Sequence, residues 1–290
     1  MTDAASIPFR KMNGLGNDFV VLDARKHKVN LGSEDAQRLG DRKGELGLGC
    51  DQVIVMEPSQ KGDVFMRIFN ADGSEVSACG NATRCVALIA AEETGRGQVS
   101  IETRAGLLTA NVEDRDTITI DMGKPRFQWD EIPLAEPFYD TTGIELQIGP
   151  VDAPVLHTPS VVNVGNPHAI FWVNNVDAHD LGRFGPLLEN HPIFPERANI
   201  SLAQITSRGS LKLRVWERGA GLTRACGTAA CAAAVAAARK DLTDRKVNVA
   251  LPGGTLVIEW ASNDHILMTG PAELEFEGAL AADTLSRVLV

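Results

Sequence analysis

The chain has 290 residues, with 28 Lys and Arg against 38 Asp and Glu, and therefore a formal charge of −10. Because an acidic chain without a basic cluster lacks the positive footprint of nucleic-acid and anionic-membrane binders, we expect neither partner. The longest apolar stretch, residues 225–238, is shorter than the roughly 20 apolar residues of a membrane-spanning helix. The first residues do not follow the pattern of a secretory signal. The length suggests two domains.

Short segments that are rich in Val, Ile or aromatic residues and bounded by Gly, Pro, Asn or Asp are typical of strands. In chain order, the predicted strands cover 18–23, 52–57, 63–70, 117–122, 169–173, 212–217, 247–251, 256–260 and 265–269. Helix-forming residues follow a Cys-Gly pair twice, over 81–94, where Gly95 is the expected C-cap, and over 228–240. The second of these helices is mostly Ala and has no polar face. We therefore expect it to be buried, as the axis around which a sheet curls.

The chain contains one internal repeat. Residues 67–80 align without a gap on residues 214–227, at an offset of 147, and residues 16–21 align on 165–170 at an offset of 149. A looser match joins 121–123 to 267–270. Three blocks in the same order indicate a duplication. It predicts an N-terminal domain over 1–125 and a C-terminal domain over 126–274, with a Pro-rich linker over 124–159.

The duplication places Cys79 and Cys226 at equivalent positions, each where a Gly-containing turn becomes a helix. The first N–H groups of a helix have no intrahelical partner and carry partial positive charge, which stabilises a thiolate and binds carboxylates. We therefore expect both thiol pKa values to lie below the ordinary value near 8.5. Gly80 and Gly227 allow a ligand to approach the backbone closely.

The other cysteines suggest no second kind of site. Five is an odd number, which argues against a disulfide framework and for a reducing compartment. Cys85 and Cys231 lie too far around their helices from Cys79 and Cys226 to share a tetrahedral metal ion, so we expect no metal. We interpret these two, and Cys50, as small buried residues.

Two thiols on opposite sides of one carbon are what a stereochemical inversion needs, since one removes a proton and the other returns a proton to the opposite face. The sequence has no Cys-x-x-Cys for redox chemistry and no nucleophile elbow. No Lys lies in a motif for a pyridoxal aldimine, which leaves a cofactor-free reaction as the expectation.

Seven segments of the chain resemble diaminopimelate epimerase, the cofactor-independent amino-acid epimerase of the lysine and cell-wall pathway. The resemblance covers nearly the whole chain. The segments are KMNGLGNDFV (11–20), DQ (51–52), FNADGSEV (69–76), ACGN (78–81), GNPH (165–168), PERAN (195–199) and ERGAG (217–221), the last followed by ACGT (225–228).

This resemblance implies an α+β fold of two similar domains from an internal duplication, each a curled, mostly antiparallel sheet around a central helix, with the active site in the cleft between them. It implies an isomerase that converts LL-diaminopimelate to meso-diaminopimelate, in lysine and peptidoglycan precursor biosynthesis, with no cofactor. It also implies that residues 275–290 return to the N-terminal domain. A cytoplasmic homodimer is the assembly that it suggests.

Residue by residue, the resemblance makes Cys79 and Cys226 the two acid–base residues. It makes His168 and Glu217 the pair that tunes the cysteine pKa values, since a charged His stabilises a thiolate and a carboxylate disfavours it. A zwitterionic diamino diacid also needs N–H groups and an Arg for its carboxylates, and oxygen acceptors for its ammonium groups. The implied substrate-binding residues are Asn17, Gln52, Asn70, Gly80, Asn81, Asn166, Asn199, Glu217, Arg218, Gly227 and Thr228.

Two other interpretations remain open at this point. Proline racemase-like and hydroxyproline epimerase-like enzymes also use two cysteines, but His follows their first Cys-Gly, whereas Asn81 stands here. The phenazine-type isomerases of the same fold lack the cysteine pair. A non-catalytic amino-acid-binding protein of this fold is the second alternative, and the presence of both thiols argues against it.

Overall fold

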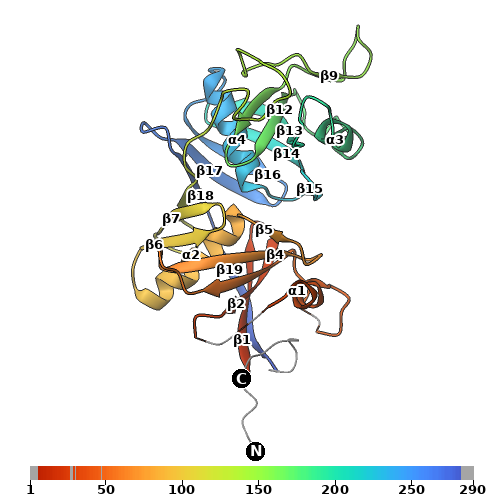
Figure 1. Cartoon of the computed structure of the whole chain (residues 1–290). Coiled ribbons are helices and arrows are strands. Elements are labelled where there is room, and N and C mark those ends of the chain that lie inside the picture. Colours follow the sequence, from red (N-terminus) through yellow and green to blue (C-terminus); the bar gives the residue numbers. More distant parts are fainter. Residues whose placement is uncertain (1–5, 27–28, 30, 47, 282–290) are drawn as a thin grey trace, which may run out of the picture. The chain divides into compact units, whose positions relative to one another are not determined.

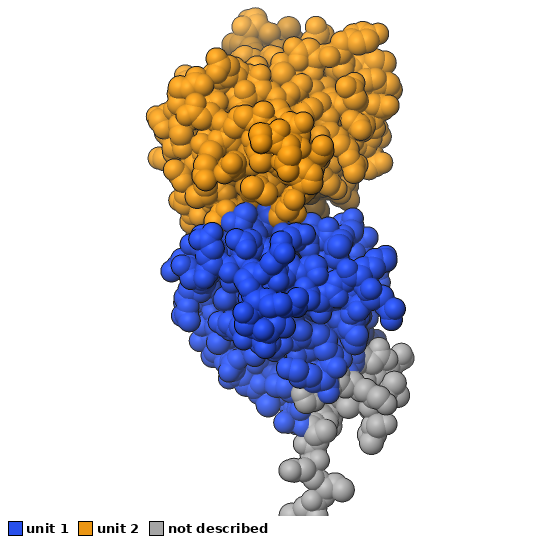
Figure 2. All heavy atoms as spheres, turned by 90° about the vertical axis from the view of Figure 1, so that its left-hand side faces the viewer, with its two compact units in different colours: residues 1–120, 270–290 blue, residues 121–269 orange. Residues whose placement is uncertain are grey.

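The computed structural model describes residues 6–26, 29, 31–46 and 48–281 (Figure 1). The chain divides into two compact units, which Figure 2 colours separately. Unit 1 comprises Met1–Ile120 and Gly270–Val290, and unit 2 comprises Asp121–Thr269. Of the C-terminal return predicted over 275–290, residues 282–290 lie outside the described part. No helix among the described residues is long and apolar enough to cross a membrane.

The described residues of unit 1 form a sheet with one long and one short helix. Strand β2 pairs parallel with β3, and β4 pairs parallel with β6, while β19–β1, β1–β2, β3–β4, β4–β5 and β6–β7 are antiparallel. The elements are β1 (Ile7–Gly14), β2 (Asn17–Asp23), α1 (Ser33–Gly40), β3 (Gln52–Glu57), β4 (Val64–Asn70), β5 (Glu75–Val76), α2 (Gly80–Thr94), β6 (Gln98–Thr103), β7 (Gly106–Val112), β8 (Ile118–Asp121) and β19 (Glu273–Leu280).

Unit 2 repeats this plan. Strand β12 pairs parallel with β13, and β14 with β16, while β11–β12, β13–β14, β14–β15, β16–β17 and β17–β18 are antiparallel. The elements are β9 (Gln147–Ile148), β10 (Leu156–His157), β11 (Ser160–Asn163), β12 (Pro167–Trp172), α3 (Leu181–Glu189), β13 (Asn199–Ser207), β14 (Ser210–Glu217), β15 (Gly221–Thr223), α4 (Gly227–Arg239), β16 (Lys246–Leu251), β17 (Gly254–Trp260) and β18 (Ile266–Gly270).

The registers of the two sheets agree residue by residue with the duplication. Phe69 lies opposite Glu75 in unit 1, and Trp216 opposite Leu222 in unit 2, which is the same pair displaced by 147 positions. This agreement between side-by-side strands goes beyond a chance match of Gly and Ala. The two units are therefore structural repeats, mostly antiparallel, as the sequence predicts.

Both predicted long helices are present and central to their units. Nearly every residue of α4 is buried, and the helix contacts β11, β12, β13, β14, β16 and β17. Helix α2 contacts β1, β2, β4, β6 and β7 and ends at Gly95, whose φ of 67° is the left-handed C-cap expected there. An apolar helix without a polar face is stable in water only when strands surround it in this way.

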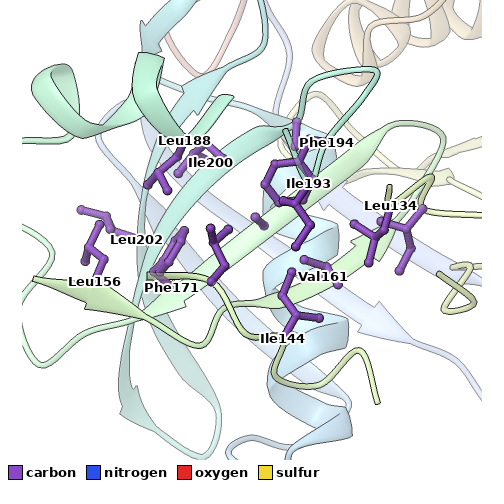
Figure 3. Packing of buried hydrophobic residues seen from close by; sticks show 14 of the residues in the cluster. Leu134, Ile144, Leu156, Val161, Phe171, Leu188, Ile193, Phe194, Ile200 and Leu202 are labelled. Atoms are coloured by element: carbon purple, nitrogen blue, oxygen red, sulfur yellow. The ribbon is translucent and has the colours of Figure 1, made fainter. Parts of the chain in front are cut away.

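The structure corrects two expectations. Among the described residues each unit contains a short second helix, α1 and α3, which the sequence did not predict because α1 has only 8 residues and α3 only 9, with Pro186 inside it. The segment 124–159 is not a linker, since Ile132, Leu134 and Ile144 are buried in a core cluster of unit 2 (Figure 3). Its apolar residues, spaced among prolines, pack on the sheet without forming long strands.

Phe171 is fully buried in that cluster, among Leu202 and Leu156 (Figure 3). We expect Phe171→Ala to lower the free energy of unfolding of unit 2 by about 3–5 kcal/mol, since it removes a large buried ring and leaves a cavity. All four tryptophans lie in unit 2, so their fluorescence during urea unfolding measures this unit. Phe171→Leu is the control and should cost clearly less; equal losses would contradict the packing argument.

Candidate active site

Cys79 and Cys226 immediately precede α2 and α4, where both backbones are extended. The N–H of Thr83 donates to the Cys79 carbonyl at 2.9 Å, and the N–H of Ala230 donates to the Cys226 carbonyl at 3.1 Å, so each helix starts at its cysteine. The two thiols thus lie at helix N-termini, as the sequence predicts. Cys79 is partly exposed and Cys226 is buried.

In unit 1 the Cys79 thiol lies beside two asparagine amides. Its Sγ is 3.9 Å from Oδ1 of Asn17, which also accepts from Nδ2 of Asn81 at 3.4 Å. The other end of the Asn17 amide donates from Nδ2 to Oδ2 of Asp51 at 2.7 Å. The structure therefore brings three of the predicted residues together at the start of α2.

Two further predicted residues of unit 1 meet across the β3–β4 pair. Gln52 lies opposite Asn70, and Nε2 of Gln52 donates to Oδ1 of Asn70 at 3.0 Å. Oε1 of Gln52 is buried and has no hydrogen-bond partner among the residues that the structure describes. Because an unpaired buried oxygen is costly, this atom is a candidate acceptor for a ligand N–H group.

In unit 2 a chain of polar contacts leads from His168 to the Cys226 thiol. Nε2 of His168 is 2.7 Å from Oδ1 of Asn166, and Nδ2 of Asn166 donates to Oγ1 of Thr228 at 3.4 Å. The Thr228 hydroxyl is 3.5 Å from Sγ of Cys226. Since its oxygen accepts from Asn166, the hydroxyl proton can be donated to the sulfur.

The remaining predicted residues of unit 2 are linked through Asn199. Its Nδ2 donates to the Pro167 carbonyl, and its Oδ1 accepts from the backbone N–H of Arg218, each at 3.0 Å. The Arg218 guanidinium donates to the Glu196 carbonyl at 2.8 Å. Glu217 accepts a hydrogen bond from the hydroxyl of Thr223.

The electrostatics of Cys226 differ from the expectation for a helix N-terminus. Burial raises the pKa of the Cys226 thiol well above its ordinary value, and the Glu217 carboxylate raises it further, while the Thr228 hydrogen bond lowers it. Desolvation of the thiolate thus outweighs the helix N–H groups, so the prediction of a lowered pKa is wrong for Cys226. Cys226 is therefore a thiol near neutral pH.

His168 is also neutral near pH 7. It is fully buried, and burial together with the Arg218 charge lowers the pKa of its imidazole to about 3. The charged histidine that would stabilise a thiolate directly is therefore not present. His168 instead contacts Asn166, and any effect on Cys226 passes through that amide.

The three other cysteines are buried, as predicted. Burial raises the pKa of the Cys50 thiol to about 11 and that of Cys85 to about 12, which makes both poor nucleophiles and bases near neutral pH. Among the described residues, no three His, Cys, Asp or Glu side chains are grouped so that they could hold a metal ion.

The two sets of residues correspond position by position. Phe19 lies opposite Gln52 in the β2–β3 pair, and His168 lies opposite Asn199 in the β12–β13 pair. In two of the pairs the side chains differ in polarity or charge. The apolar Phe19 corresponds to His168, and the neutral Asn70 corresponds to the charged Glu217. The equivalent pairs are Asn17 and Asn166, Phe19 and His168, Gln52 and Asn199, Asn70 and Glu217, Cys79 and Cys226, and Asn81 and Thr228.

Sequence reasoning assigned no role to two residues that contact this set. Asp51 bonds Asn17, and the fully buried Arg84 donates from Nη2 to Oδ1 of Asn81 at 3.1 Å. A charged residue inside the apolar run of α2 was the available signal for Arg84, because buried charges need partners. Asp51 lay within a matched segment, but its partner could not be read from the sequence.

Solved structures with this fold define the class. The chain is similar to the phenazine biosynthesis protein of the PhzF family from Bacillus anthracis, with a TM-score of 0.65 and 19% identity, covering 95% of this chain and 99% of that one. It is also similar to a hydroxyproline epimerase from Agrobacterium vitis, with a TM-score of 0.64 and 14% identity, covering 98% and 94%. At these identities the likeness concerns the fold, which is that of the two-domain epimerases and racemases.

Sequence comparison is more specific within this class. The family model described as diaminopimelate epimerase matches residues 9–128 and 160–275. A diaminopimelate epimerase of Rhodopseudomonas palustris strain BisB18 is 57% identical over 281 residues, covering 96% of each chain. One from Afipia carboxidovorans is 55% identical over 287 residues, covering 98% of each. The chain belongs to the diaminopimelate epimerase family.

Proposed function

We propose that this protein inverts one α-carbon of LL-diaminopimelate to give meso-diaminopimelate, with Cys79 and Cys226 as the two acid–base residues. The observation that supports this most directly is the duplicated helix start, at which each unit presents one cysteine. Cys79 lies beside the Asn17 amide, and Cys226 lies beside the Thr228 hydroxyl, which Asn166 bonds. In this proposal the two units are the two epimerase domains, and they act without a cofactor.

Each turnover requires one thiolate to take the α-proton and the other cysteine, as a thiol, to return a proton to the opposite face of the same carbon. Negative charge then develops on the α-carboxylate. Backbone N–H groups at a helix start stabilise such a charge and cost no reorganisation when the charge appears. Gly80-Asn81 and Gly227-Thr228 supply these N–H groups in the proposed mechanism.

The other side chains would recognise the two ends of a diamino diacid. Arg218 suits a carboxylate, and the amide oxygens of Asn17, Gln52 and Asn70 suit ammonium groups. Glu217 has two proposed roles, since its charge attracts an ammonium group and also keeps the nearby Cys226 protonated. Asn166 and Asn199 complete the proposed binding set, and His168 acts through Asn166.

The family resemblance also supports two finer proposals. We infer that the protein is a homodimer and that it works in the cytoplasm. The odd number of cysteines, with none needed for a disulfide, fits a reducing compartment.

The function is tested by incubating the wild-type protein in heavy water with LL-diaminopimelate and no added cofactor. We expect meso-diaminopimelate to form, with deuterium at the inverted α-carbon, because the returned proton comes from a solvent-exchanged thiol. L-Proline and trans-4-hydroxy-L-proline should stay unchanged, and their inversion would favour the alternative racemase reading. Binding of LL-diaminopimelate without deuterium exchange would instead identify a non-catalytic binding protein.

A further inference from the structure

A chain of three hydrogen bonds beside Cys79 runs in one direction. Nη2 of Arg84 donates to Oδ1 of Asn81 at 3.1 Å, Nδ2 of Asn81 donates to Oδ1 of Asn17 at 3.4 Å, and Nδ2 of Asn17 donates to Oδ2 of Asp51 at 2.7 Å. All four residues belong to unit 1. The chain starts at a guanidinium and ends at a carboxylate.

The charged ends determine the direction. A guanidinium can only donate hydrogen bonds and an ionised carboxylate can only accept them, whereas a primary amide can do either, depending on which way it is turned. Turning the Asn17 amide by 180° would place its oxygen against Asp51 and its NH₂ group against Asn81, so both contacts would be lost. Asp51 and Arg84 thus leave the two amides one arrangement.

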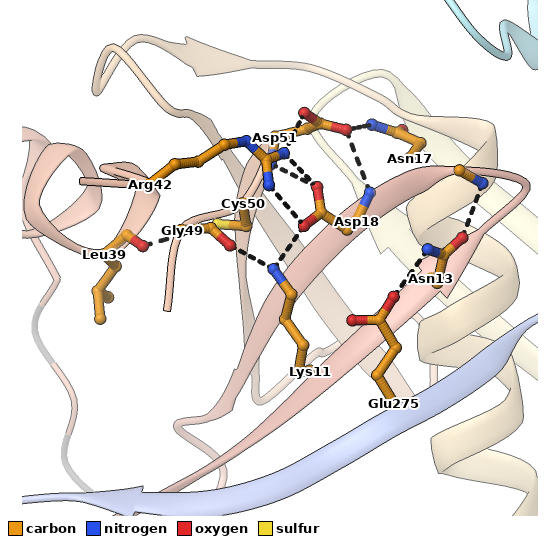
Figure 4. A network of polar contacts seen from close by, with 11 residues as sticks. Lys11, Asn13, Asn17, Asp18, Leu39, Arg42, Gly49, Cys50, Asp51 and Glu275 are labelled. Atoms are coloured by element: carbon orange, nitrogen blue, oxygen red, sulfur yellow. Dashed lines mark hydrogen bonds and ion pairs between the residues drawn. The ribbon is translucent and has the colours of Figure 1, made fainter. Parts of the chain in front are cut away.

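Asp51 is itself held in place by a network of charges (Figure 4). Its Oδ1 accepts from Arg42 at 2.7 Å, and its Oδ2 also accepts from the backbone N–H of Asp18 at 3.2 Å. Arg42 is bound in turn to the Asp18 carboxylate at 2.6 Å, and Lys11 bonds the same carboxylate at 2.6 Å. The oxygen that faces Asn17 therefore has a fixed position.

The consequence for Cys79 is an acceptor beside its sulfur. Oδ1 of Asn17 lies 3.9 Å from Sγ, where it can accept the S–H proton. In unit 2, Ala198 occupies the position equivalent to Asp51, and the contact of Asn166 with His168 leaves its NH₂ group toward Thr228. The two equivalent amides are therefore oriented in opposite senses by different neighbours.

We propose that Asp51 is a positioning residue for the epimerase reaction, which fixes the Asn17 amide with its oxygen toward Cys79. This role rests on the proposed function, in which Cys79 is one of the two acid–base residues. The acceptor aligns the S–H bond of the thiol form and supplies an oxygen for a substrate ammonium group. A donor in the same place would hold the thiolate instead.

The test is Asp51→Asn, at a side chain that is 41% exposed and so tolerates the change. The new amide keeps its oxygen on Arg42 and turns its NH₂ group toward Asn17. We expect Asn17 then to rotate, giving up its 3.4 Å contact with Asn81, and to present NH₂ to Cys79. We expect kcat with LL-diaminopimelate to fall about 10-fold or more, while alkylation of Cys79 by iodoacetamide at pH 7.5 becomes several-fold faster. If the substitution only loosened the site, thermal stability would fall. Faster alkylation of Cys79 at unchanged thermal stability therefore indicates a reoriented amide.

Loss of the Asp51 charge could by itself favour a thiolate, so the alkylation is repeated at about 0.5 M NaCl, which screens exposed charges but not a local hydrogen bond. The acceleration should persist there. Asp23→Asn is the matched control, since Asp23 bonds Arg25 at 2.8 Å at the other end of β2, and it should leave both rates unchanged. Unchanged or slower Cys79 alkylation, or an acceleration abolished by salt, would overturn the proposal. Because alkylation needs no turnover, this result is separate from the test of the epimerase function.

Discussion

Replacing either Cys79 or Cys226 by Ala is expected to lower kcat for LL-diaminopimelate by about 10²- to 10⁴-fold, the range for loss of a general acid or base. The two losses should be similar, because inversion needs both a base and an acid in every turnover. Removing the second thiol from a variant that already lacks the first should cost little more, since residues that act as a unit are non-additive. Conversion is measured by chiral chromatography of the diaminopimelate stereoisomers.

The chain contains matched controls for both substitutions. Cys85 lies about 1.7 turns beyond Cys79 along α2, and Cys231 lies within the Ala-rich α4; both thiols are buried away from solvent, so Cys85→Ala and Cys231→Ala are the controls. Each control should keep kcat near the wild-type value. If Cys79→Ala or Cys226→Ala also inverts the substrate at nearly the wild-type rate, the two-thiol mechanism is wrong.

The local sequence predicted helices and strands correctly where one local property determines the structure. The two apolar helices were predictable because helix formers follow Cys-Gly turns. Nine of the described strands were predictable because β-branched residues gather between turn formers. Strand β1 was missed because it contains Lys11, which is buried through its ion pair with Asp18, a partner on the neighbouring strand. Strand β13 was missed because it begins with polar residues that are buried, among them Asn199 and Ser201.

The same distinction applies to the candidate site. The positions of Cys79 and Cys226 followed from the repeat, since a helix start is a local feature. The pKa direction of Cys226 and the neutral state of His168 did not, because both depend on burial created by distant segments. Asp51 was overlooked for a related reason, since its bond to Asn17 joins residues 34 positions apart.

Glu217→Gln is expected to move the alkaline limb of the activity profile to lower pH. The Glu217 carboxylate raises the pKa of Cys226, so its removal lowers that pKa, and the thiol form is lost at a lower pH. A reaction direction in which Cys226 must donate a proton then becomes slower on the alkaline side of the profile, while burial keeps Cys226 a thiol near neutral pH. The amide still accepts the hydrogen bond from Thr223, so the local fold is retained.

The expected shift can be measured without substrate as well. The rate of Cys226 alkylation, followed against pH by peptide mass spectrometry, should rise at lower pH in Glu217→Gln than in the wild type, because thiolate is the reactive form. Glu259→Gln on β17 removes a carboxylate of the same unit that pairs with Lys246 at 3.0 Å, and should leave the profile unchanged. A profile that stays in place or moves to higher pH in Glu217→Gln would show that this carboxylate does not keep Cys226 protonated. Glu217, the charged counterpart of the neutral Asn70, would then act on the substrate alone.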